Sequence, residues 1–245
     1  MTMPENYQLI ELDSVDSTNR YLKDYCRQQL PDKMLFCQTH RQTAGYGQLQ
    51  RSWSSNKDSL IFSIAYPLAT KQRINGLVSL HLASLIQQTL VSLNPTETIK
   101  LKWPNDLYNA QGKIAGILIE QVIKNDYQAL IIGVGINRQS EQTHQMLSAI
   151  EQVGAVAFFD DQRFFQTLHD KLIAQPLTEI DYDDLHGYWQ AHDYFAYQET
   201  LQLIEQQQSQ LVQYIGIDEQ GAAQVLLEHQ LKTLSSGQSS LRKLN

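Results

Sequence analysis

The residues best suited to chemistry are an aspartate and a lysine that lie close together in the sequence, Asp106 and Lys113. Asp106 ends the segment 102–106 (KWPND). A short polar turn separates it from Lys113, which precedes the apolar run 114–120. Charges beside a core are costly unless they meet each other, a metal or a charged ligand. The pair therefore indicates a site that handles anions, with a structural salt bridge across a hairpin as the alternative.

A second candidate is the polar, glycine-containing segment 42–53, which has little periodicity. Gly45 and Gly47 are two residues apart and let backbone N–H groups approach a ligand closely. Arg51 can pair with a phosphate, and Trp53 can cover a base or another ring. The segment is compatible with a ligand-binding loop and equally with an ordinary surface loop.

Two further motifs have a structural and a functional interpretation. Residues 17–19 (STN) lie at a strand-to-helix junction, where their spacing favours a plain helix N-cap. They could also bind a neutral polar ligand. Gly133 and Gly135 in an apolar run predict close approach of the backbone, which tight packing alone would explain. Asn137 offers a donor and an acceptor that suit a purine edge. The spacing lacks the third glycine of a dinucleotide fingerprint.

Hydrophobic periodicity predicts the elements that carry these motifs. Helical spacing follows residue 17 and recurs at 77–93, 164–174 and around 185–189. Strands are expected at 9–15, 34–39, 60–66 (stopping at Pro67), 99–103, 107–108, 114–122 and 129–136, and short strands with turn signals follow residue 198. Hairpins dominate without strict strand–helix alternation, which favours an α+β fold with a largely antiparallel or mixed sheet.

Composition narrows the functional class. The chain has 245 residues, 42% of them hydrophobic, and a net charge of −7, which argues against nucleic acid as the main partner. Cys26 and Cys37 lack a metal-ligand spacing, so two buried thiols in a reducing cytosol are expected rather than a disulfide. No targeting segment is visible, and the apolar runs fall short of the ~18 residues that span a membrane. We therefore expect a soluble, cytoplasmic protein.

Together the motifs resemble biotin protein ligase. The resemblance rests on five motifs in order: 17–19, 42–47 with Arg51 and Trp53, 102–106, 113–117 and 133–137. Trp189, the turn 216–221 and the segment 236–242 add to it, so it covers essentially the whole chain. Each motif is short, but a chance match would have to reproduce five of them in register.

The resemblance implies a two-step reaction. Biotin and MgATP give biotinyl-5′-AMP and pyrophosphate. A lysine of a biotin carboxyl carrier protein, usually that of acetyl-CoA carboxylase, then takes the biotin and releases AMP. The resemblance also implies a class II synthetase-like catalytic domain at 1–197 and a small SH3-like β-barrel at 198–245.

The resemblance assigns roles residue by residue and assigns no metal ligand. Lys113, Asp106 and Arg51 take the catalytic roles. Lys113 meets the biotin carboxylate and the phosphoryl group, and Asp106 lies where the acceptor lysine arrives. Biotin is assigned to Ser17, Thr18, Asn19, Gln42, Gly45, Tyr46, Gly47, Gln48, Lys113, Gly116 and Gly133. The nucleotide is assigned to Arg51, Trp53, Asn105 and Asn137.

Two departures from the family pattern matter. Relatives often carry several arginines in the glycine loop, where this chain has Tyr46, Gln48 and Leu49, so weaker retention of the adenylate is expected. Ser17 lies too near Met1 for the winged helix of repressor-type members, which predicts a monofunctional enzyme without DNA binding. A lipoate-type ligase and a degenerate, non-catalytic biotin-binding protein remain alternatives. The sequence does not indicate the oligomeric state.

Overall fold

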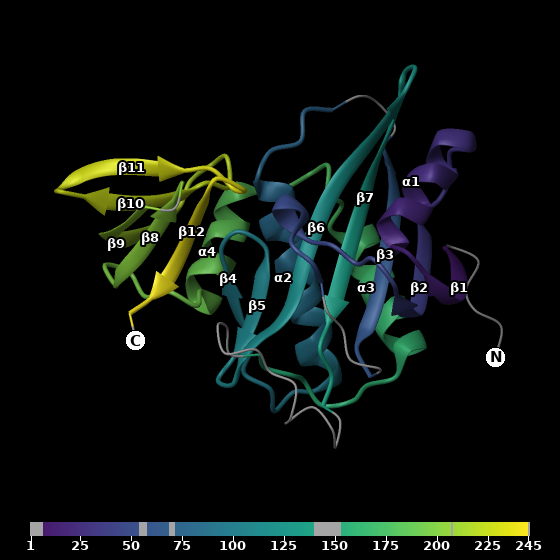
Figure 1. The fold of residues 1–245 in the computed structure, drawn as a ribbon, viewed down its shortest axis with the longest axis horizontal. Helices are drawn as coiled ribbons and strands as arrows, with labels where there is room; N and C mark the ends of the chain where they lie inside the picture. The colour runs from purple at the N-terminus through teal and green to yellow at the C-terminus, as the bar shows by residue number, and fades with distance from the viewer. Residues whose placement is uncertain (1–6, 54–57, 69–71, 140–152, 207, 245) are drawn as a thin grey trace. The chain divides into compact units, whose positions relative to one another are not determined.

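The structure is a computed structural model that describes residues 7–53, 58–68, 72–139, 153–206 and 208–244. The chain divides into two compact units, residues 1–73 with 109–169 (unit 1) and residues 74–108 with 170–245 (unit 2). Helices and strands occur in both units (Figure 1), which confirms the predicted α+β class. Within the described residues, no helix is long and apolar enough to cross a membrane.

Unit 1 is built on a mixed sheet. Its strands run in the spatial order β1-β2-β3-β7-β6. The β1–β2 pair is parallel, whereas β2–β3, β3–β7 and β6–β7 are antiparallel. The strand bounds are β1 Gln8–Val15, β2 Leu35–Gln42, β3 Leu60–Leu68, β6 Gly112–Lys124 and β7 Tyr127–Ile136. The predicted strands are therefore present, with ends that differ by a few residues.

Helix α1 (Thr18–Gln28) covers one face of this sheet (Figure 1). Its apolar side buries Leu22 and Cys26 against alternate residues of the strands, including Cys37 and Ala65. Because strand side chains alternate between faces, Phe36 points the other way, where it meets Phe165 of α3 (Asp161–Ala174) edge to face. The sheet is thus covered on both faces, as its largely apolar strands require.

The two cysteines are buried and free, as predicted. Burial raises the pKa of the Cys26 thiol to about 11 and that of the Cys37 thiol to about 12. Both side chains lie in the core between α1 and the sheet. They therefore act as small apolar groups rather than nucleophiles.

One predicted strand end is wrong. Strand β3 was expected to stop at Pro67, but it continues to Leu68, and Pro67 pairs in register with Ala129 of β7. The β2 partner reaches only as far as Ala65. Beyond that point β3 is an edge strand on its β2 side, where a missing N–H costs no ladder hydrogen bond.

Unit 2 contains a largely buried helix, a partly buried helix and a short hairpin. Helix α2 (Leu77–Leu93) matches its predicted bounds and is buried on most of its surface. Gln87 on α2 donates to the Ile99 backbone oxygen. Helix α4 (Tyr182–His192) begins after Asp181, whose side chain accepts from the Asp184 N–H. Strands β4 (Lys100–Lys102) and β5 (Asp106–Asn109) pair antiparallel.

The C-terminal part of unit 2 is an antiparallel sheet in the order β11-β10-β9-β8-β12. Its strands are β8 Thr200–Glu205, β9 Gln208–Ile217, β10 Ala223–Leu227, β11 Gln230–Leu234 and β12 Ser239–Lys243. Strands β8 and β9 form a hairpin that closes at the Glu205–Gln208 pair, and residue 207 lies outside the described residues. Closure into an SH3-like barrel and the domain boundary at 197/198 stay predictions.

A buried carboxylate, Asp193, ties several elements of unit 2 together. One carboxylate oxygen accepts from Trp189 Nε1 at 3.0 Å and from Tyr214 Oη at 2.6 Å. The other accepts from the Phe195 N–H at 3.0 Å. Burial raises the pKa of Asp193 to about 6, against 3.8 for an ordinary aspartate, even though these hydrogen bonds act to lower it.

This raised pKa predicts a pH-dependent stability. The folded state holds the Asp193 proton more tightly, so the stabilisation is present below pH ~4 and is lost as pH rises through about 6. A shift of this size corresponds to roughly 2–3 kcal/mol. In urea unfolding from pH 4 to 7.5, wild type should therefore lose that much stability relative to Asp193→Asn. A stability difference that does not vary with pH would contradict this account.

Candidate active site

A buried polar cluster lies where β1 leads into α1. Ser17 is the N-cap residue of α1, but its side chain makes no capping hydrogen bond, so the plain N-cap interpretation does not account for its hydroxyl. Ser17, Thr18 and Asn19 are each at most 3% exposed. Buried polar side chains at the start of a helix indicate a local polar environment rather than a solvated turn.

Hydrogen bonds join this cluster to β2 and β3. Gln42 Oε1 accepts from the Thr18 N–H at 2.9 Å and from Thr18 Oγ1 at 3.2 Å. Ser63 Oγ lies 2.7 Å from Thr18 Oγ1 and 2.6 Å from Asn19 Oδ1. Ser63 was missed in the sequence, where the signal was one polar residue inside the apolar run 60–66.

Glycines on β6 and β7 make room for this chemistry. A methyl group at Gly133 would lie 2.5 Å from Asn19 Oδ1, and one at Gly135 would lie 2.4 Å from Trp53 Cζ2. A methyl group at Gly116 would lie 2.9 Å from Trp53 Cζ3 and 3.3 Å from Lys113 Nζ. The close approach predicted at Gly133 and Gly135 is confirmed, and the groups that approach are candidate site residues. We call this surface, formed by Gly116, Gly133 and Gly135, the glycine face.

The segment 45–53 folds back on itself above the glycine face. The Gly47 N–H donates to the Arg51 oxygen at 2.8 Å, and the Trp53 N–H donates to the Gly45 oxygen at 3.0 Å. Tyr46 and Ser52 form an antiparallel bridge. We call residues 45–53 the glycine loop. Trp53 Nε1 is buried and has no hydrogen-bond partner among the described residues.

Lys113 lies beside Trp53 on the same side of the sheet. Its Nζ is 5.5 Å from the centre of the Trp53 ring, within range of a cation–π contact. The Asn137 side-chain amide donates to the Lys113 oxygen at 3.2 Å and to the Gly154 oxygen at 3.3 Å. Asn137 therefore fixes the backbone that carries Lys113, and its predicted contact with a purine stays a prediction.

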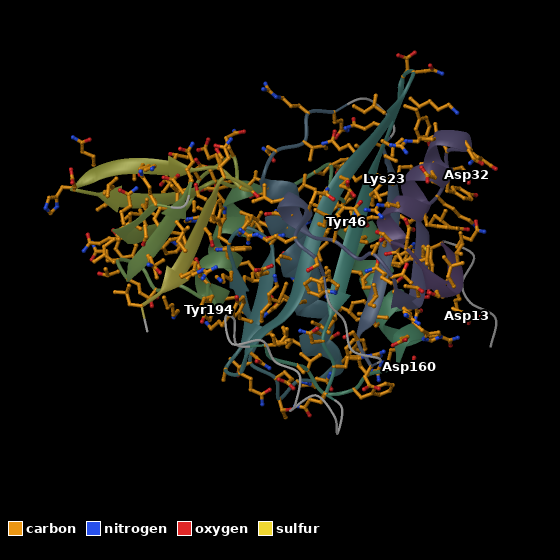
Figure 2. All side chains as sticks on the ribbon, viewed as in Figure 1. Asp13, Lys23, Asp32, Tyr46, Asp160 and Tyr194 are labelled. Atoms are coloured by element: carbon orange, nitrogen blue, oxygen red, sulfur yellow. The ribbon has the colours of Figure 1, made fainter. Side chains whose placement is uncertain are left out.

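A second polar network, around Glu120 of β6, was not predicted. Glu120 accepts from Asn19 Nδ2 at 2.9 Å, from Lys23 Nζ at 2.7 Å and from Tyr46 Oη at 2.6 Å. Figure 2 labels Lys23 on α1 and Tyr46 on the glycine loop. The signals available in the sequence were a carboxylate in an apolar strand and a lysine one helical turn after Asn19.

The charges in this network reinforce one another. Burial acts to raise the pKa of Glu120, but hydrogen bonds from Lys23, Tyr46 and Asn19 outweigh it and hold that pKa below its usual value. Burial acts to lower the pKa of Lys23, and its bonds to Glu120 and Tyr46 outweigh it in the same way, so its pKa is raised. Both groups are therefore charged at neutral pH.

Unit 1 thus brings together most of the predicted site residues. They are Ser17, Thr18, Asn19, Gln42, Gly45, Tyr46, Gly47, Gln48, Arg51, Trp53, Lys113, Gly116, Gly133 and Asn137. Arg51 is exposed, as is Leu49 at 67%. Asp106 and Asn105 belong to unit 2, where Asp106 pairs with Lys102 across the β4–β5 hairpin. The pairing of Asp106 with Lys113 stays a prediction.

Comparison with known proteins gives the family. The sequence profile of the biotin/lipoate A/B protein ligase family matches residues 11–137, more than half of the chain, so the chain belongs to this family. The bifunctional ligase/repressor BirA of Escherichia coli is 27% identical over 241 residues, covering 94% of this chain and 73% of that protein. BirA of Salmonella typhimurium is 31% identical over 153 residues, 56% of this chain and 47% of that protein.

The chain therefore spans about half of the Salmonella relative. Among solved structures, the biotin protein ligase of Aquifex aeolicus in complex with biotin and ATP has a TM-score of 0.76 at 24% identity. That alignment covers 97% of this chain and 99% of the Aquifex chain. At this level of identity the comparison establishes the fold, and the mixed α+β architecture agrees with it.

The glycine face yields a direct prediction. In Gly135→Ala the new methyl group would lie 2.4 Å from the Trp53 ring, so the indole must leave its position. With 5-fluorotryptophan incorporated, the ¹⁹F resonance assigned to Trp53 should shift, whereas those of Trp103 and Trp189 should not. Gly187→Ala is the control, because a methyl group there meets nothing within 4 Å. An unmoved Trp53 resonance in Gly135→Ala would contradict the described packing.

Proposed function

We propose that this protein is a biotin protein ligase that activates biotin with ATP and transfers it to a lysine of a biotin carboxyl carrier protein. The observation that carries the proposal is the grouping, within unit 1, of the polar cluster, the glycine face, Lys113 and Trp53. Family membership supports it, as do the names of the BirA relatives and of the Aquifex structure.

The polar cluster favours biotin over lipoate, the other substrate in the family's name. The ureido ring of biotin has one carbonyl acceptor and two N–H donors, whereas the dithiolane ring of lipoate has no comparable polar groups. Ser17, Thr18 and Asn19 are buried and polar, and filling such a site with an apolar ring leaves polar groups unpaired. On this proposal the ureido ring binds at the cluster and the valerate chain crosses the glycine face toward Lys113.

Lys113 is assigned to the first chemical step. A carboxylate oxygen of biotin attacks the α-phosphorus of ATP, the bond to the bridging oxygen breaks, and pyrophosphate leaves. Two anions must approach each other, so a fixed ammonium group between them lowers the barrier. The Asn137 amide, by binding the Lys113 backbone oxygen, fixes the point from which that side chain extends.

In the second step the ε-amine of the acceptor lysine attacks the acyl carbonyl of biotinyl-AMP. An amide bond forms, AMP leaves with the bond electrons, and the amine loses a proton. Asp106 is assigned to orient the incoming amine or accept its proton. Trp53 would cover the intermediate and limit its hydrolysis by water.

Magnesium belongs to this proposal as an ion that accompanies ATP. Among the described residues, no group of three or more His, Cys, Asp or Glu side chains could hold a metal ion. Mg²⁺ commonly binds through substrate phosphates plus one or two carboxylates, and it would neutralise phosphate charge during attack. We also propose that the protein is cytoplasmic and that its acceptor is the carrier protein of acetyl-CoA carboxylase. We propose no nucleic acid or membrane partner.

ATP–pyrophosphate exchange tests the proposed function. Purified protein should exchange label between pyrophosphate and ATP when biotin is added, and lipoate at the same concentration should support far less exchange. Equal or greater exchange with lipoate would favour the lipoate-type alternative. Tight biotin binding without exchange or carrier labelling would favour a non-catalytic biotin-binding protein.

Lys113→Ala should reduce biotin-dependent exchange by at least about 100-fold, because the ammonium group acts where charge develops. The matched control is Lys124→Ala, which removes an exposed lysine from the end of the same strand. The control should keep near wild-type exchange, and both variants should stay folded by circular dichroism. Near wild-type exchange in Lys113→Ala would exclude the assigned role.

Asp106→Asn should slow transfer while leaving adenylation largely intact. In single-turnover assays with preformed biotinyl-AMP and a carrier domain, we expect a rate reduction of roughly 100-fold, the lower end of the range for a positioned acid or base. Asp126→Asn, an exposed change in the β6–β7 turn, is the control. Unchanged transfer by Asp106→Asn would remove that residue from the mechanism.

A further inference from the structure

Glu120 connects the two parts of the candidate site. It lies on β6, and its side chain is 24% exposed. One of its oxygens accepts from Asn19, a member of the polar cluster, and from Tyr46, a member of the glycine loop. The other accepts from Lys23 on α1. A single carboxylate is therefore shared by the helix, the sheet and the loop.

The Tyr46 side chain is held by hydrogen bonds to its hydroxyl and by cation–π contacts to its ring. Its hydroxyl accepts from Lys23 Nζ at 3.0 Å and donates to Glu120 Oε2 at 2.6 Å. Its ring lies beneath two cations of α1, with Arg20 Cζ 5.0 Å and Lys23 Nζ 5.6 Å from the ring centre. Charge-assisted hydrogen bonds and cation–π contacts both strengthen as water is excluded, so the half-buried ring is well held.

The contacts that hold Tyr46 also restrain Trp53, because both residues belong to the glycine loop. The Tyr46–Ser52 bridge and the backbone bonds from Gly47 to Arg51 and from Trp53 to Gly45 make the segment a small hairpin. Fixing Tyr46 on one strand of such a hairpin restrains Trp53 on the other strand, because Trp53 bonds to Gly45, the neighbour of Tyr46. Trp53 in turn lies against Gly135 and next to Lys113.

We propose that Lys23 and Glu120 are positioning residues that latch the glycine loop closed over the glycine face through the Tyr46 hydroxyl. The Lys23–Glu120 ion pair does not need the loop, so it remains formed when the loop opens. Opening gives up only the contacts of Tyr46, and the freed polar groups are near enough to the surface to be hydrated. The latch is therefore reversible, as a loop that admits substrate must be.

If the proposed function is correct, on which this part of the inference rests, the latch also determines how long biotinyl-AMP is retained. Loss of one charge-assisted contact should raise the open-to-closed ratio of the loop by about fivefold to fiftyfold. The dissociation rate of the intermediate should rise by a similar factor. The rate of adenylation in a closed complex should change much less, because neither Lys23 nor Glu120 is placed at the reacting atoms.

Acrylamide quenching of tryptophan fluorescence tests the latch in the ligand-free protein. Trp103 and Trp189 are at most 1% exposed, so quenching reports mainly on Trp53, and Trp53→Phe gives the background. Tyr46→Phe removes only the hydroxyl, and Lys23→Met removes the cation. Both should increase quenching. Arg27→Met, which breaks an exposed ion pair with Asp24 on the same helix, should leave quenching unchanged.

A purely structural role for Lys23 predicts a different pattern. In that case quenching would track loss of thermal stability, whereas the latch predicts increased quenching even in variants that melt like wild type. Lys23→Arg, which keeps the positive charge and the donor, should restore low quenching. Wild-type quenching in both Tyr46→Phe and Lys23→Met would overturn the latch.

Dissociation of biotinyl-AMP from the same variants tests the consequence for the reaction. Faster release in Tyr46→Phe and Lys23→Met, but not in Arg27→Met, supports the role in retention. Unchanged release overturns that role. If wild type shows no biotin-dependent exchange at all, the proposed function fails, and the quenching experiment on the ligand-free protein still decides whether the latch exists.

Discussion

The candidate site depends on one steric constraint, the absence of side chains at Gly116, Gly133 and Gly135. These positions lie on neighbouring antiparallel strands, where Gly116 pairs directly with Gly135. A methyl group at any of them would come within 2.9 Å of a site side chain. Because the glycine face has no side chains, Asn19 and Trp53 can lie directly against the sheet. Strand β6 contributes Gly116 to the glycine face and also carries Lys113 and Glu120. One strand therefore supplies both part of the bare surface and two charged side chains of the site.

Much of this organisation could be predicted because it is local. The 77–93 helix and most strands follow from periodicity alone, and the glycines at 133 and 135 indicated close approach before any neighbour was known. The error at Pro67 has an equally plain reason. Whether a proline ends a strand depends on which side of that strand is paired, and β3 lacks a β2 partner beyond Ala65. Pairing of this kind is set by the tertiary fold.

The parts that sequence reasoning missed are long-range polar contacts. Glu120 meets Asn19 across 101 positions of the chain and Tyr46 across 74, and nothing local to any of them indicates the meeting. Asp193 likewise gathers donors from α4 and β9, and these hydrogen bonds only partly offset the burial that raises its pKa. In each case one carboxylate organises several elements, since a buried charge is tolerated only where donors converge on it.

We propose that biotin binds on the glycine face with its ureido ring in the polar cluster. A crystal structure of the protein with biotin tests it most directly. We predict the ureido group within hydrogen-bond distance of the cluster formed by residues 17–19 and Gln42, the valerate chain between Trp53 and Gly135, and the carboxylate at Lys113 Nζ. Biotin bound elsewhere, or lying in the reverse orientation with its carboxylate in the cluster, would contradict the account.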